Sequence, residues 1–587
     1  MKQFLITVAG VLVGLFLFLF VAPIAIIMIV SASVSSGPPQ PSAMVLSLDL
    51  REPMTDQTPQ NPFAALGGGH ALLEVIARID AARTDDHVKG IYVRAATDGM
   101  SPAHAEEIRA ALQAFQASGK FVVAHLQNDG VRMSMPGYMA VADADELWLQ
   151  DSSEFMPMGL SAEVTFFADT LRRYHALAQF ETREEYKTAA HSFTQNGFTP
   201  AHREELSGLM NGLYDVMLAN IAADREITPA AARAAVEATP FTAARAAELH
   251  LIDHRGRPED AERAALARAD NENAEVVDFA AYRAPSHGGG PVIAVVQGEG
   301  AIVSGPESHD LFGDESVMNS DVISQALLEA SEDENVKAII FRVSSPGGSV
   351  VASDQILHAL RTAQERGKKV IVSMGDVAAS GGYYVAAEAD EIIADPTTIT
   401  GSIGVLGGKL IIGDAMEHYL SAHTERLQVG SPLVTMFSAE TQFTPAERAA
   451  FAGFIDRAYQ DFLGLVAAGR NLTVAQVREV ARGRVWTGQQ ALDRHLVDHL
   501  GGFQVAVTRA RALAEIDEDA SVTLRYFPTQ KSPFESLERF FGVSAESAQA
   551  LARLNAVMSD PRVARAIAVL GEENTGVRAE SQQIDVR

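Results

Sequence analysis

Short apolar runs alternate with amphipathic stretches along most of this chain. In the second half, Ala338–Phe341 and Val370–Val372 are runs typical of buried strands. The stretch between them has helical periodicity, with Ser353 as the expected N-cap and Gly367 at the expected end. Strand and helix alternating at this spacing predict an α/β fold with mostly parallel strands.

The pattern occurs twice. The heptapeptide VKAIIFR (336–342) matches VKGIYVR (88–94), 248 positions earlier, and FTPAER (443–448) matches FTPAHR (198–203), 245 positions earlier. Five further pairs of identical residues are also 245 positions apart: Tyr214 and Tyr459, Arg225 and Arg470, Thr242 and Thr487, His250 and His495, Asp253 and Asp498. Such self-similarity indicates that one fold has been laid down twice in tandem.

Stretches rich in proline, glycine, serine or polar residues mark the expected boundaries. The predicted parts are a membrane anchor at 1–32, a tether at 33–43, a first repeat at 44–283, a linker at 284–290, a second repeat at 291–518, and a C-terminal extension with a mobile tail at 519–587.

The anchor is predicted from one long apolar segment. Phe4–Val30 contains 27 residues and no charged side chain, enough to span a bilayer at about 1.5 Å per residue. A cleaved signal peptide has an apolar stretch of only about 7–15 residues, so an uncleaved single span is favoured. Lys2 favours a cytoplasmic N-terminus, which places the repeats in the periplasm of an inner-membrane protein if the source is Gram-negative.

Composition narrows the function classes. A net charge of −28 over 587 residues argues against nucleic acid as a partner, and against an anionic lipid surface as the main one. The chain has no cysteine, which excludes disulfides, thiol nucleophiles and cysteine-based metal sites. We expect no metal and no cofactor.

A candidate nucleophile lies in the segment DVAASGGYY (376–384), between a buried strand and a helix. Ser380 would project from the helix N-terminus, and the N–H groups of Gly381 and of the Gly347–Gly348 turn could form an oxyanion hole. Taken alone, the segment is explained more simply as a turn of small residues that packs helix on strand. In the first half Met135 and Pro136 occupy the two matching positions, and proline has no N–H to offer.

A nucleophilic serine needs a base, and no histidine of the second half stands in an evident motif. His358 is predicted on a helix surface, and His418 and His423 flank Tyr419 without a recognisable context. His495 has its counterpart in the half that lacks the serine, so a structural role is expected for it.

Three motifs then resemble a known family. SPGGSV (345–350), MGDVAASGGYY (374–384) and TGSIGV (400–405) resemble, in this order, the motifs of signal peptide peptidase A in its long, membrane-anchored, tandem-repeat type. The resemblance implies an α/β fold of tandem duplicated ClpP/crotonase-like domains after one N-terminal transmembrane helix. It implies a Ser–Lys dyad, with Ser380 as nucleophile, Lys187 of the first repeat as general base and Ser402 as the serine that orients the lysine. It further implies cleaved signal peptides as substrates and a homotetramer.

The spacing of the repeats agrees with this assignment. The position that matches Lys187 in the second repeat is Pro432, and the position that matches Ser402 in the first repeat is Pro157. The second repeat therefore lacks the lysine, and the first repeat lacks the serine. To act as a base, Lys187 must be neutral, which requires its pKa to be lowered from about 10.4 by burial between the repeats.

Two other functions stay open. A crotonase-type acyl-CoA enzyme also uses glycine-rich oxyanion turns, although the anchor and the lack of an acid/base carboxylate motif disfavour it. A membrane-tethered assembly scaffold with a degenerate dyad would show no acylation of Ser380 by any probe.

Overall fold

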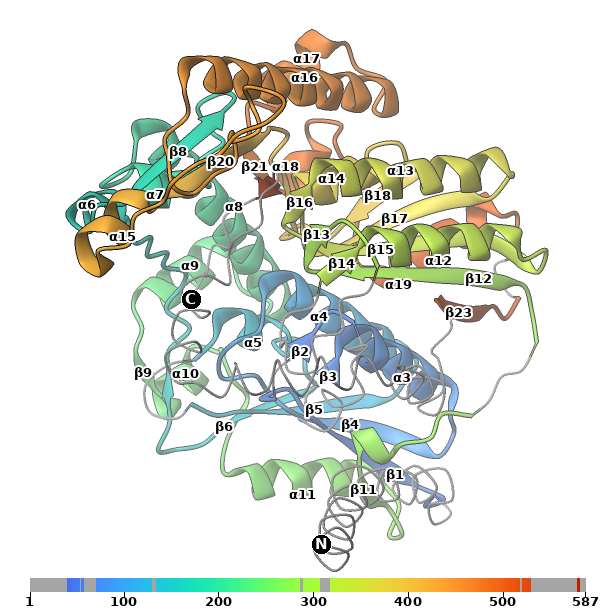
Figure 1. Ribbon diagram of the computed structural model, residues 1–587. Helices are drawn as coiled ribbons and strands as arrows, with labels where there is room; N and C mark the ends of the chain where they lie inside the picture. The colour runs from blue at the N-terminus through green and yellow to red at the C-terminus, as the bar shows by residue number, and fades with distance from the viewer. Residues whose placement is uncertain are drawn as a thin grey trace, which may run out of the picture.

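The computed structural model describes residues 40–52, 54–57, 70–128, 133–285, 289–306, 317–517 and 520–528, and the backbone of 578–580. Two α/β units lie against each other, the first lower in the view of Figure 1 and the second above it. The predicted anchor segment Phe4–Val30 and most of the C-terminal extension lie outside the described residues. Within the described residues, no helix is long and apolar enough to cross a membrane.

The first unit is built on a six-stranded parallel sheet in the order β10-β6-β5-β4-β1-β11. Its strands are β1 (Met44–Asp49), β4 (Val88–Arg94), β5 (Phe121–Leu126), β6 (Glu146–Leu149), β10 (His254–Arg255) and β11 (Glu275–Asp278). Helices α3 (Leu72–Thr84) and α4 (Pro102–Gln116) cover one face, and α11 (Pro258–Arg268) covers the other (Figure 1).

The second unit repeats this sheet strand for strand. Its parallel core has the order β22-β18-β17-β15-β12-β23. The strands are β12 (Val292–Glu299), β15 (Val336–Ser345), β17 (Lys369–Ala379), β18 (Glu391–Ala394), β22 (His499–Leu500) and β23 (Thr523–Phe527). Helices α12 (Ser320–Glu332) and α13 (Val350–Glu365) lie on one face, and α19 (Phe503–Leu513) lies on the other.

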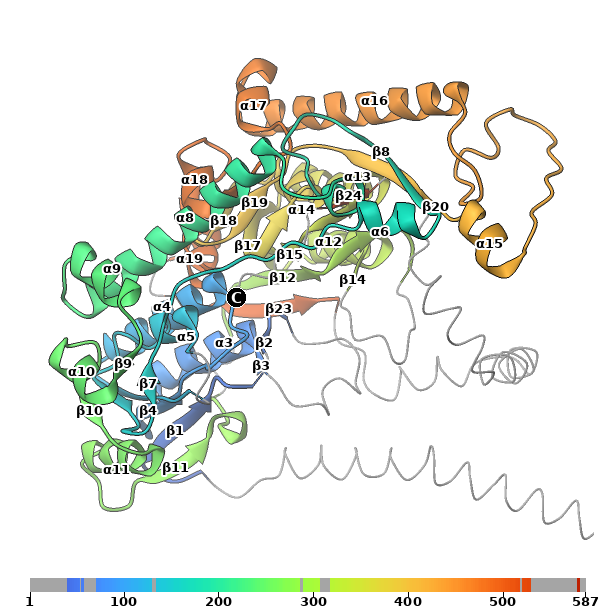
Figure 2. The ribbon, with the colours of Figure 1, turned by 90° about the vertical axis from the view of Figure 1, so that its left-hand side faces the viewer.

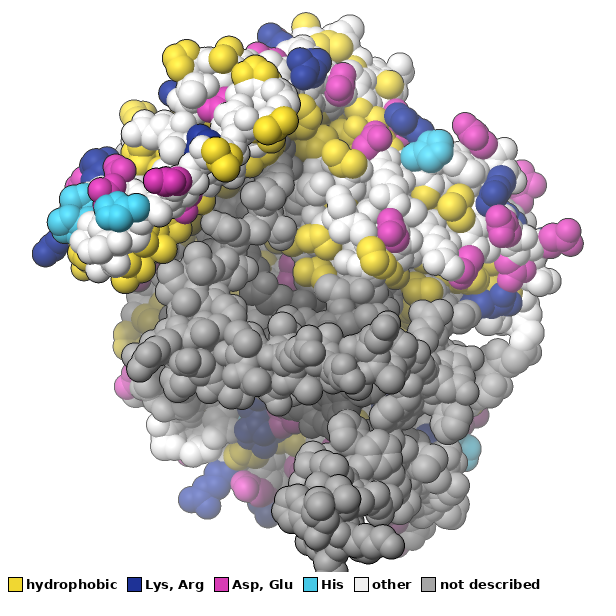
Figure 3. Space-filling model, in the orientation of Figure 1, with side chains coloured by type: hydrophobic (Ala, Val, Ile, Leu, Met, Phe, Trp, Pro, Cys, Tyr) yellow, Lys and Arg dark blue, Asp and Glu magenta, His cyan; other side chains and the backbone are white. Residues whose placement is uncertain are grey.

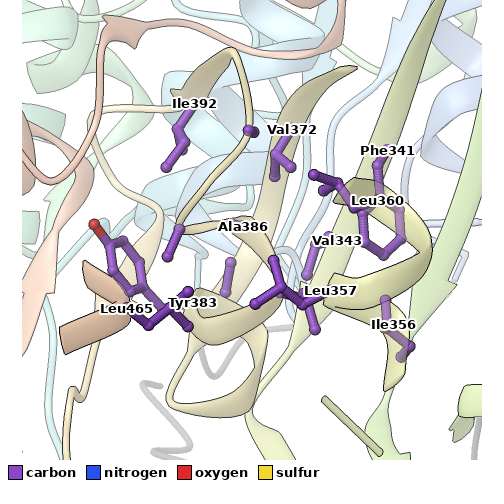
Figure 4. Close-up of a cluster of buried hydrophobic side chains, with 14 of the residues drawn as sticks. Phe341, Val343, Ile356, Leu357, Leu360, Val372, Tyr383, Ala386, Ile392 and Leu465 are labelled. Carbon is purple, nitrogen blue, oxygen red and sulfur yellow. The ribbon is translucent and has the colours of Figure 1, made fainter. Parts of the chain in front are cut away.

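Side chains alternate between the two faces of each sheet, as a buried parallel sheet requires. On β12, Ala294 and Val296 face α12 and α13, whereas Ile293 and Val295 face α19. Leu73 of α3 belongs to the α19 cluster, so the core of the second unit extends onto the first. Figure 4 shows Leu357 and Leu360 of α13 packed beside Val343 and Phe341 of β15, with Tyr383 and Ala386 nearby.

Details of packing confirm the duplication. Tyr138 and Tyr383, 245 positions apart, each donate a hydrogen bond of 2.8 Å to a backbone carbonyl, of Leu251 and Leu496 respectively. Two long helices also match: α8 (Pro200–Asp224) and α16 (Pro445–Gly469) have 25 residues each and begin after a threonine N-cap. The α/β class and the tandem repeat are therefore confirmed.

An arm joins the two units. Strand β8 (Leu177–Thr182) of the first pairs antiparallel with β20 (Leu406–Ile411) of the second. The arm also carries α6 (Ala168–Arg173), α7 (His191–Thr194) and α15 (Gly413–Leu420), and it projects from the body of the molecule (Figure 2). Apolar side chains gather on it (Figure 3), and α15 and the segment after it expose Tyr419, Leu420, Leu427 and Val429.

Two observations bear on the expected boundaries. Strand β23 lies beyond the boundary predicted at residue 518, yet it pairs with β12 as β11 pairs with β1. The sheet of the second unit therefore extends to Phe527. Helix α13 begins at Val350 rather than after Ser353, because Ser349 accepts the capping hydrogen bond from the N–H of Ala352. Its end, just before Gly367, is as predicted.

The smaller elements complete the description. They are β2 (Met54–Thr55), β3 (His70–Ala71), α5 (Met135–Met139), β7 (Glu154–Phe155), α9 (Pro229–Glu237), β9 (Phe241–Thr242), α10 (Ala243–Glu248), η3 (Phe279–Ala281), β13 (Ala301–Val303), β14 (Val317–Asn319), β16 (Gly347–Ser349), α14 (Gly381–Ala386), β19 (Ile399–Gly401), α17 (Val474–Val480), β21 (Val485–Thr487), α18 (Gly488–Leu492) and β24 (Arg578–Glu580).

Candidate active site

Ser380 stands between the end of β17 and the start of α14, as the sequence predicts. Its backbone has φ +57° and ψ −114°, an unusual conformation for a residue other than glycine. The backbone is held there because the Ser380 N–H donates to the Gly401 carbonyl at 2.8 Å and the Ser380 carbonyl accepts from the Tyr384 N–H at 2.8 Å. The side chain is buried.

Lys187 lies on the loop between β8 and α7 of the first unit and reaches into the second. Its Nζ lies 2.8 Å from Ser380 Oγ and 3.0 Å from Ser402 Oγ, and it donates to the Ser402 carbonyl at 3.1 Å. Only 2% of Lys187 is exposed. The structure thus brings together the three residues that the resemblance assigned to catalysis, 193 positions apart for lysine and nucleophile.

The antiparallel pair of β8 and β20 explains this juxtaposition. Strand β8 ends at Thr182, shortly before Lys187, and β20 begins at Leu406, shortly after Ser402. Because Thr182 and Leu406 are register partners, the two flanking loops must emerge at the same place. The arm therefore positions Lys187 of one unit against Ser402 of the other.

A short loop of the second unit packs directly on the lysine backbone. The N–H of Tyr186 donates to the Arg482 carbonyl at 3.2 Å. Gly483 has φ +80°, and a Cβ there would lie 2.5 Å from the backbone nitrogen of Lys187. Only glycine fits at this position. The N–H of Ser402 donates to the Arg484 carbonyl at 2.7 Å, so the same loop also holds the backbone of Ser402.

The glycines predicted for the oxyanion hole are neighbours in space. A Cβ on Gly381 would lie 3.1 Å from the backbone nitrogen of Gly348 and 2.7 Å from Ser353 Oγ. The N–H of Gly347 donates to Ser345 Oγ at 3.1 Å. The predicted turn forms a three-residue strand, β16, parallel to β13.

Strand β16 also accepts an extended chain on its other side. Gly347–Ser349 pairs antiparallel with β24, a segment of the same polypeptide's C-terminal region. Because antiparallel pairing uses main-chain groups only, this edge can hold a peptide independently of its sequence. The paired segment runs next to the glycines that adjoin Ser380.

Glu205 of α8 is a site residue that motif reasoning missed. It is 5% exposed, and its carboxylate accepts from Thr188 Oγ1 at 3.2 Å and from the Val485 N–H at 3.0 Å. Thr188 directly follows the lysine. The matching position in the second repeat is Ala450, so the comparison of repeats that supported Lys187 would also have identified Glu205.

A second buried polar cluster joins the two units at β15 and β17. Arg342 of β15 is fully buried and binds Asp56 and Glu107 of the first unit. Burial alone would lower the pKa of His104, but ion pairing with Asp376 and Asp56 raises it to about 9. These contacts place the first unit's charges against the carboxyl ends of β15 and β17.

The histidines considered earlier lie elsewhere. His358, His418, His423 and His495 are exposed. The carbonyl of His495 accepts from Arg470 Nε, as that of His250 accepts from Arg225 Nε, which is a structural role common to both repeats. Among the residues that the structure describes, no group of three or more His, Asp or Glu side chains could hold a metal ion.

Comparison with known proteins agrees with this duplicated fold. The model of Peptidase family S49 matches residues 114–272 and 362–517, once in each repeat and together more than half of the chain. The chain is 31% identical to Protease 4 of Salmonella typhi over 468 residues, which are 76% of this chain and 73% of that protein. It is 28% identical to Protease 4 of Haemophilus influenzae over 489 residues, 79% of this chain and 77% of the relative.

A plant relative matches at similar length. The chain is 27% identical to the chloroplastic serine protease SPPA of Arabidopsis thaliana over 501 residues, 82% of this chain and 70% of the relative. The duplicated α/β fold and the matches define the class of protein, a serine protease. The chain belongs to Peptidase family S49, in the tandem-repeat form of the signal peptide peptidase A type. Membership of a peptidase family argues against the two alternative functions, a crotonase-type acyl-CoA enzyme and an assembly scaffold.

Proposed function

We propose that this protein is a membrane-anchored endopeptidase that uses a Ser380–Lys187 dyad to hydrolyse cleaved signal peptides and similar unfolded peptides on the periplasmic side of the inner membrane. The observation that carries the dyad is the distance of 2.8 Å between Lys187 Nζ and Ser380 Oγ in a buried environment. Burial disfavours the charged form of an amine and so favours the neutral base.

The hydrogen-bond partners of Lys187 fit a neutral amine. Such an amine has two N–H groups and one lone pair. The Ser402 carbonyl can only accept, so it takes one N–H, and Ser402 Oγ can take the other. The lone pair is then left for the proton of Ser380 Oγ, which is the geometry of a general base.

The reaction follows from this arrangement. Ser380 Oγ attacks the scissile carbonyl carbon as Lys187 takes its proton, and the N–H groups of Gly381 and Gly348 stabilise the oxyanion. The protonated lysine gives its proton to the leaving nitrogen as the C–N bond breaks, which leaves an acyl-enzyme. Lys187 next takes a proton from water, the hydroxide attacks the ester, and Ser380 recovers its proton. Gly347, whose N–H donates to Ser345, keeps the strand in place in this scheme.

Substrates are proposed to bind as an extra strand on β16. The pairing of β16 with β24 shows that an extended main chain fits this edge beside the glycines that adjoin Ser380. Only an unfolded peptide can offer a free strand of this kind. Signal peptide remnants meet this requirement, and the proposed anchor at Phe4–Val30 would hold the enzyme in the bilayer that releases them.

The assembly is proposed to be a homo-oligomer, a tetramer by the resemblance. Support comes from the arm, where Leu427 and Val429 are almost fully exposed. Apolar side chains gathered in this way are typical of an interface. Light scattering of the detergent-solubilised protein measures the mass directly, and a monomer would contradict the assembly.

Acylation of Ser380 tests the dyad. The full-length protein in detergent is treated with a fluorophosphonate and read by intact mass. We expect a single adduct on the wild type and none on Ser380→Ala or Lys187→Ala. Ser324→Ala and Lys120→Ala, which remove a buried serine of α12 and a lysine bonded to two carbonyls, serve as controls and keep the adduct. A folded wild type without an adduct contradicts the proposal.

A further inference from the structure

We propose that Glu205 is the positioning residue of the Lys187–Ser380 pair: its carboxylate ties together the two segments that enclose Lys187 and supplies the buried negative charge that faces the amine. The inference rests on the dyad proposed above and goes beyond it, because it assigns a third group that controls how the lysine behaves.

Two hydrogen bonds of the Glu205 carboxylate connect the two segments. One carboxylate oxygen accepts from Thr188 Oγ1, next to the lysine, and the other accepts from the N–H of Val485. Val485 pairs with Gly401 in the ladder of β21 and β19, and the Gly401 carbonyl accepts the N–H of Ser380. A single side chain of the first repeat thus connects the lysine loop to the strand that holds the nucleophile.

The repeats provide an internal control. In the second repeat the residue that matches Glu205 is Ala450, and in the first repeat the residue that matches Val485 is Pro240, which has no N–H to donate. Both acceptor and donor are therefore present only across the junction that holds Lys187. The contact joins α8 of the first unit to β21 of the second, so it is not part of the fold that the two repeats share.

The surroundings of Glu205 are mostly apolar, which keeps its charge effective. Leu209 and Leu213, one and two turns further along α8, form a buried cluster with Val485. The charged and titratable groups that face this region are Lys187 and the neighbouring Tyr186, Arg484 of the adjacent loop, His191 of α7, and His202 and Glu204 of α8 itself. Arg484 pairs with the exposed carboxylate of Glu204 at 2.7 Å.

Burial raises the pKa of Glu205 to about 7, while its two hydrogen bonds and the positive charges of Lys187 and Arg484 act in the opposite direction. The carboxyl therefore changes its charge near neutral pH. When it is ionised, it stabilises the protonated form of Lys187, and when it is neutral it does not. The fraction of neutral, active lysine thus depends on Glu205.

Glu205→Gln removes the negative charge but can keep both hydrogen bonds, so it tests the charge separately. The amide oxygen can still accept from the Val485 N–H and the amide N–H can donate to Thr188 Oγ1, so both ties remain. Removal of the negative charge leaves the ammonium form of Lys187 less favourable. The midpoint of the acid limb of the acylation rate should then move to lower pH by about one unit, which is about a tenfold gain on that limb.

The experiment measures the rate of Ser380 acylation by the fluorophosphonate against pH, on the full-length protein in detergent. The matched control is Glu204→Gln, which removes the exposed carboxylate next door and should leave the midpoint where the wild type has it. Glu205→Asp keeps the charge but shortens the tie, so its rate should fall severalfold with the midpoint unchanged.

The outcomes separate the two proposals. A wild type that is never acylated refutes the dyad. A wild type that is acylated, with Glu205→Gln following the same pH profile or Glu205→Asp shifted as far as Glu205→Gln, refutes the role of Glu205 and leaves the dyad intact. Thermal unfolding gives a readout independent of activity: the melting temperature of Glu205→Gln relative to the wild type should rise between about pH 4.5 and pH 7. In this range the Glu205 carboxyl ionises in the unfolded wild type but stays protonated in the folded one, which lowers the stability of the wild type alone. A difference that stays constant with pH counts against a buried titrating Glu205.

Discussion

At the scale of single residues, the site depends on a glycine whose missing side chain allows a close backbone contact. Gly483 lets a loop of the second unit lie against the backbone of Lys187, where a Cβ would approach to 2.5 Å. Motif reasoning identified Lys187 because proline replaces it in the other repeat, but Gly483 belongs to no motif. Its importance depends on a contact between residues about 300 positions apart, which no local pattern can reveal.

Gly483→Ala should therefore abolish acylation of Ser380, because the methyl group must displace the Lys187 segment. Gly367 provides the control: its φ of +83° is close to the +80° of Gly483, but nothing lies within 4 Å of the position of its Cβ. Gly367→Ala has the backbone strain without the displacement, and it should be acylated at the wild-type rate at temperatures where it is folded. Equal loss of labelling in both variants would attribute the effect to strain alone.

Ser402→Ala should reduce kcat about 10–100-fold while leaving KM nearly unchanged, because the amine loses the hydroxyl that directs its lone pair. Peptide hydrolysis measured at saturating and low substrate separates the two constants. The neighbouring Thr400→Ser, which keeps its hydroxyl, is the control. A rise in KM alone would place Ser402 in substrate binding instead.

At the scale of elements, the two repeats diverge at one strand. Strand β5 of the first sheet has six residues, whereas its counterpart β17 has eleven and continues to Ala379. The extension pairs with β19, whereas among the described residues of the first repeat the matching β7 pairs only with β9. The longer strand brings Ser380, the proposed nucleophile, close to Ser402, and the first repeat has no such extension among its described residues.

Elements formed by local signals were predicted from the sequence, and those formed by distant partners were not. The strand–helix order and the helix after Ser380 followed from periodicity and small residues. The predicted Gly347–Gly348 turn became a strand because β13 pairs with it, and β23 joins the sheet from about 230 positions beyond its neighbour β12. For α13, both Ser349 and Ser353 can cap a helix, and the sequence alone does not rank them.

Thr400→Val should loosen the extension of β17. Thr400 Oγ1 donates to the Ala378 carbonyl at 2.7 Å in a fully buried position, and valine leaves that carbonyl without its donor. We expect a loss of about 1–2 kcal/mol in the free energy of unfolding, measured with urea, and severalfold slower acylation. Thr362→Val, on an exposed turn of α13, is the matched control. An unchanged acylation rate would show that β17 is held without this bond.

At the scale of the whole molecule, the units are joined by charge as well as by apolar packing. Arg342 is completely buried and pairs with carboxylates of the other repeat. Such a cluster need not stabilise the protein relative to an apolar core, but it is costly to break from one side.

Arg342→Met should lower the free energy of unfolding by about 3–5 kcal/mol, because Asp56 and Glu107 would remain buried without their counter-charge. Urea denaturation of the full-length protein measures the loss. Arg233→Met, which removes exposed ion pairs with Asp215 and Glu237 and a contact with the Tyr214 ring, should change stability by less than about 1 kcal/mol. A small effect of Arg342→Met would mean that the two carboxyls take up protons or reach water when the arginine is removed.

The division of the proposed dyad between two repeats also determines when the protein can become active. The ribosome adds about 5–20 residues per second, so Ser380 is made roughly 10–40 s after Lys187. A nascent chain that already exposes its first repeat holds a base without a nucleophile. A fragment that contains only the second repeat holds a nucleophile without a base. On that proposal, neither of these species can hydrolyse a peptide, so activity begins only when both repeats have been made and have folded against each other.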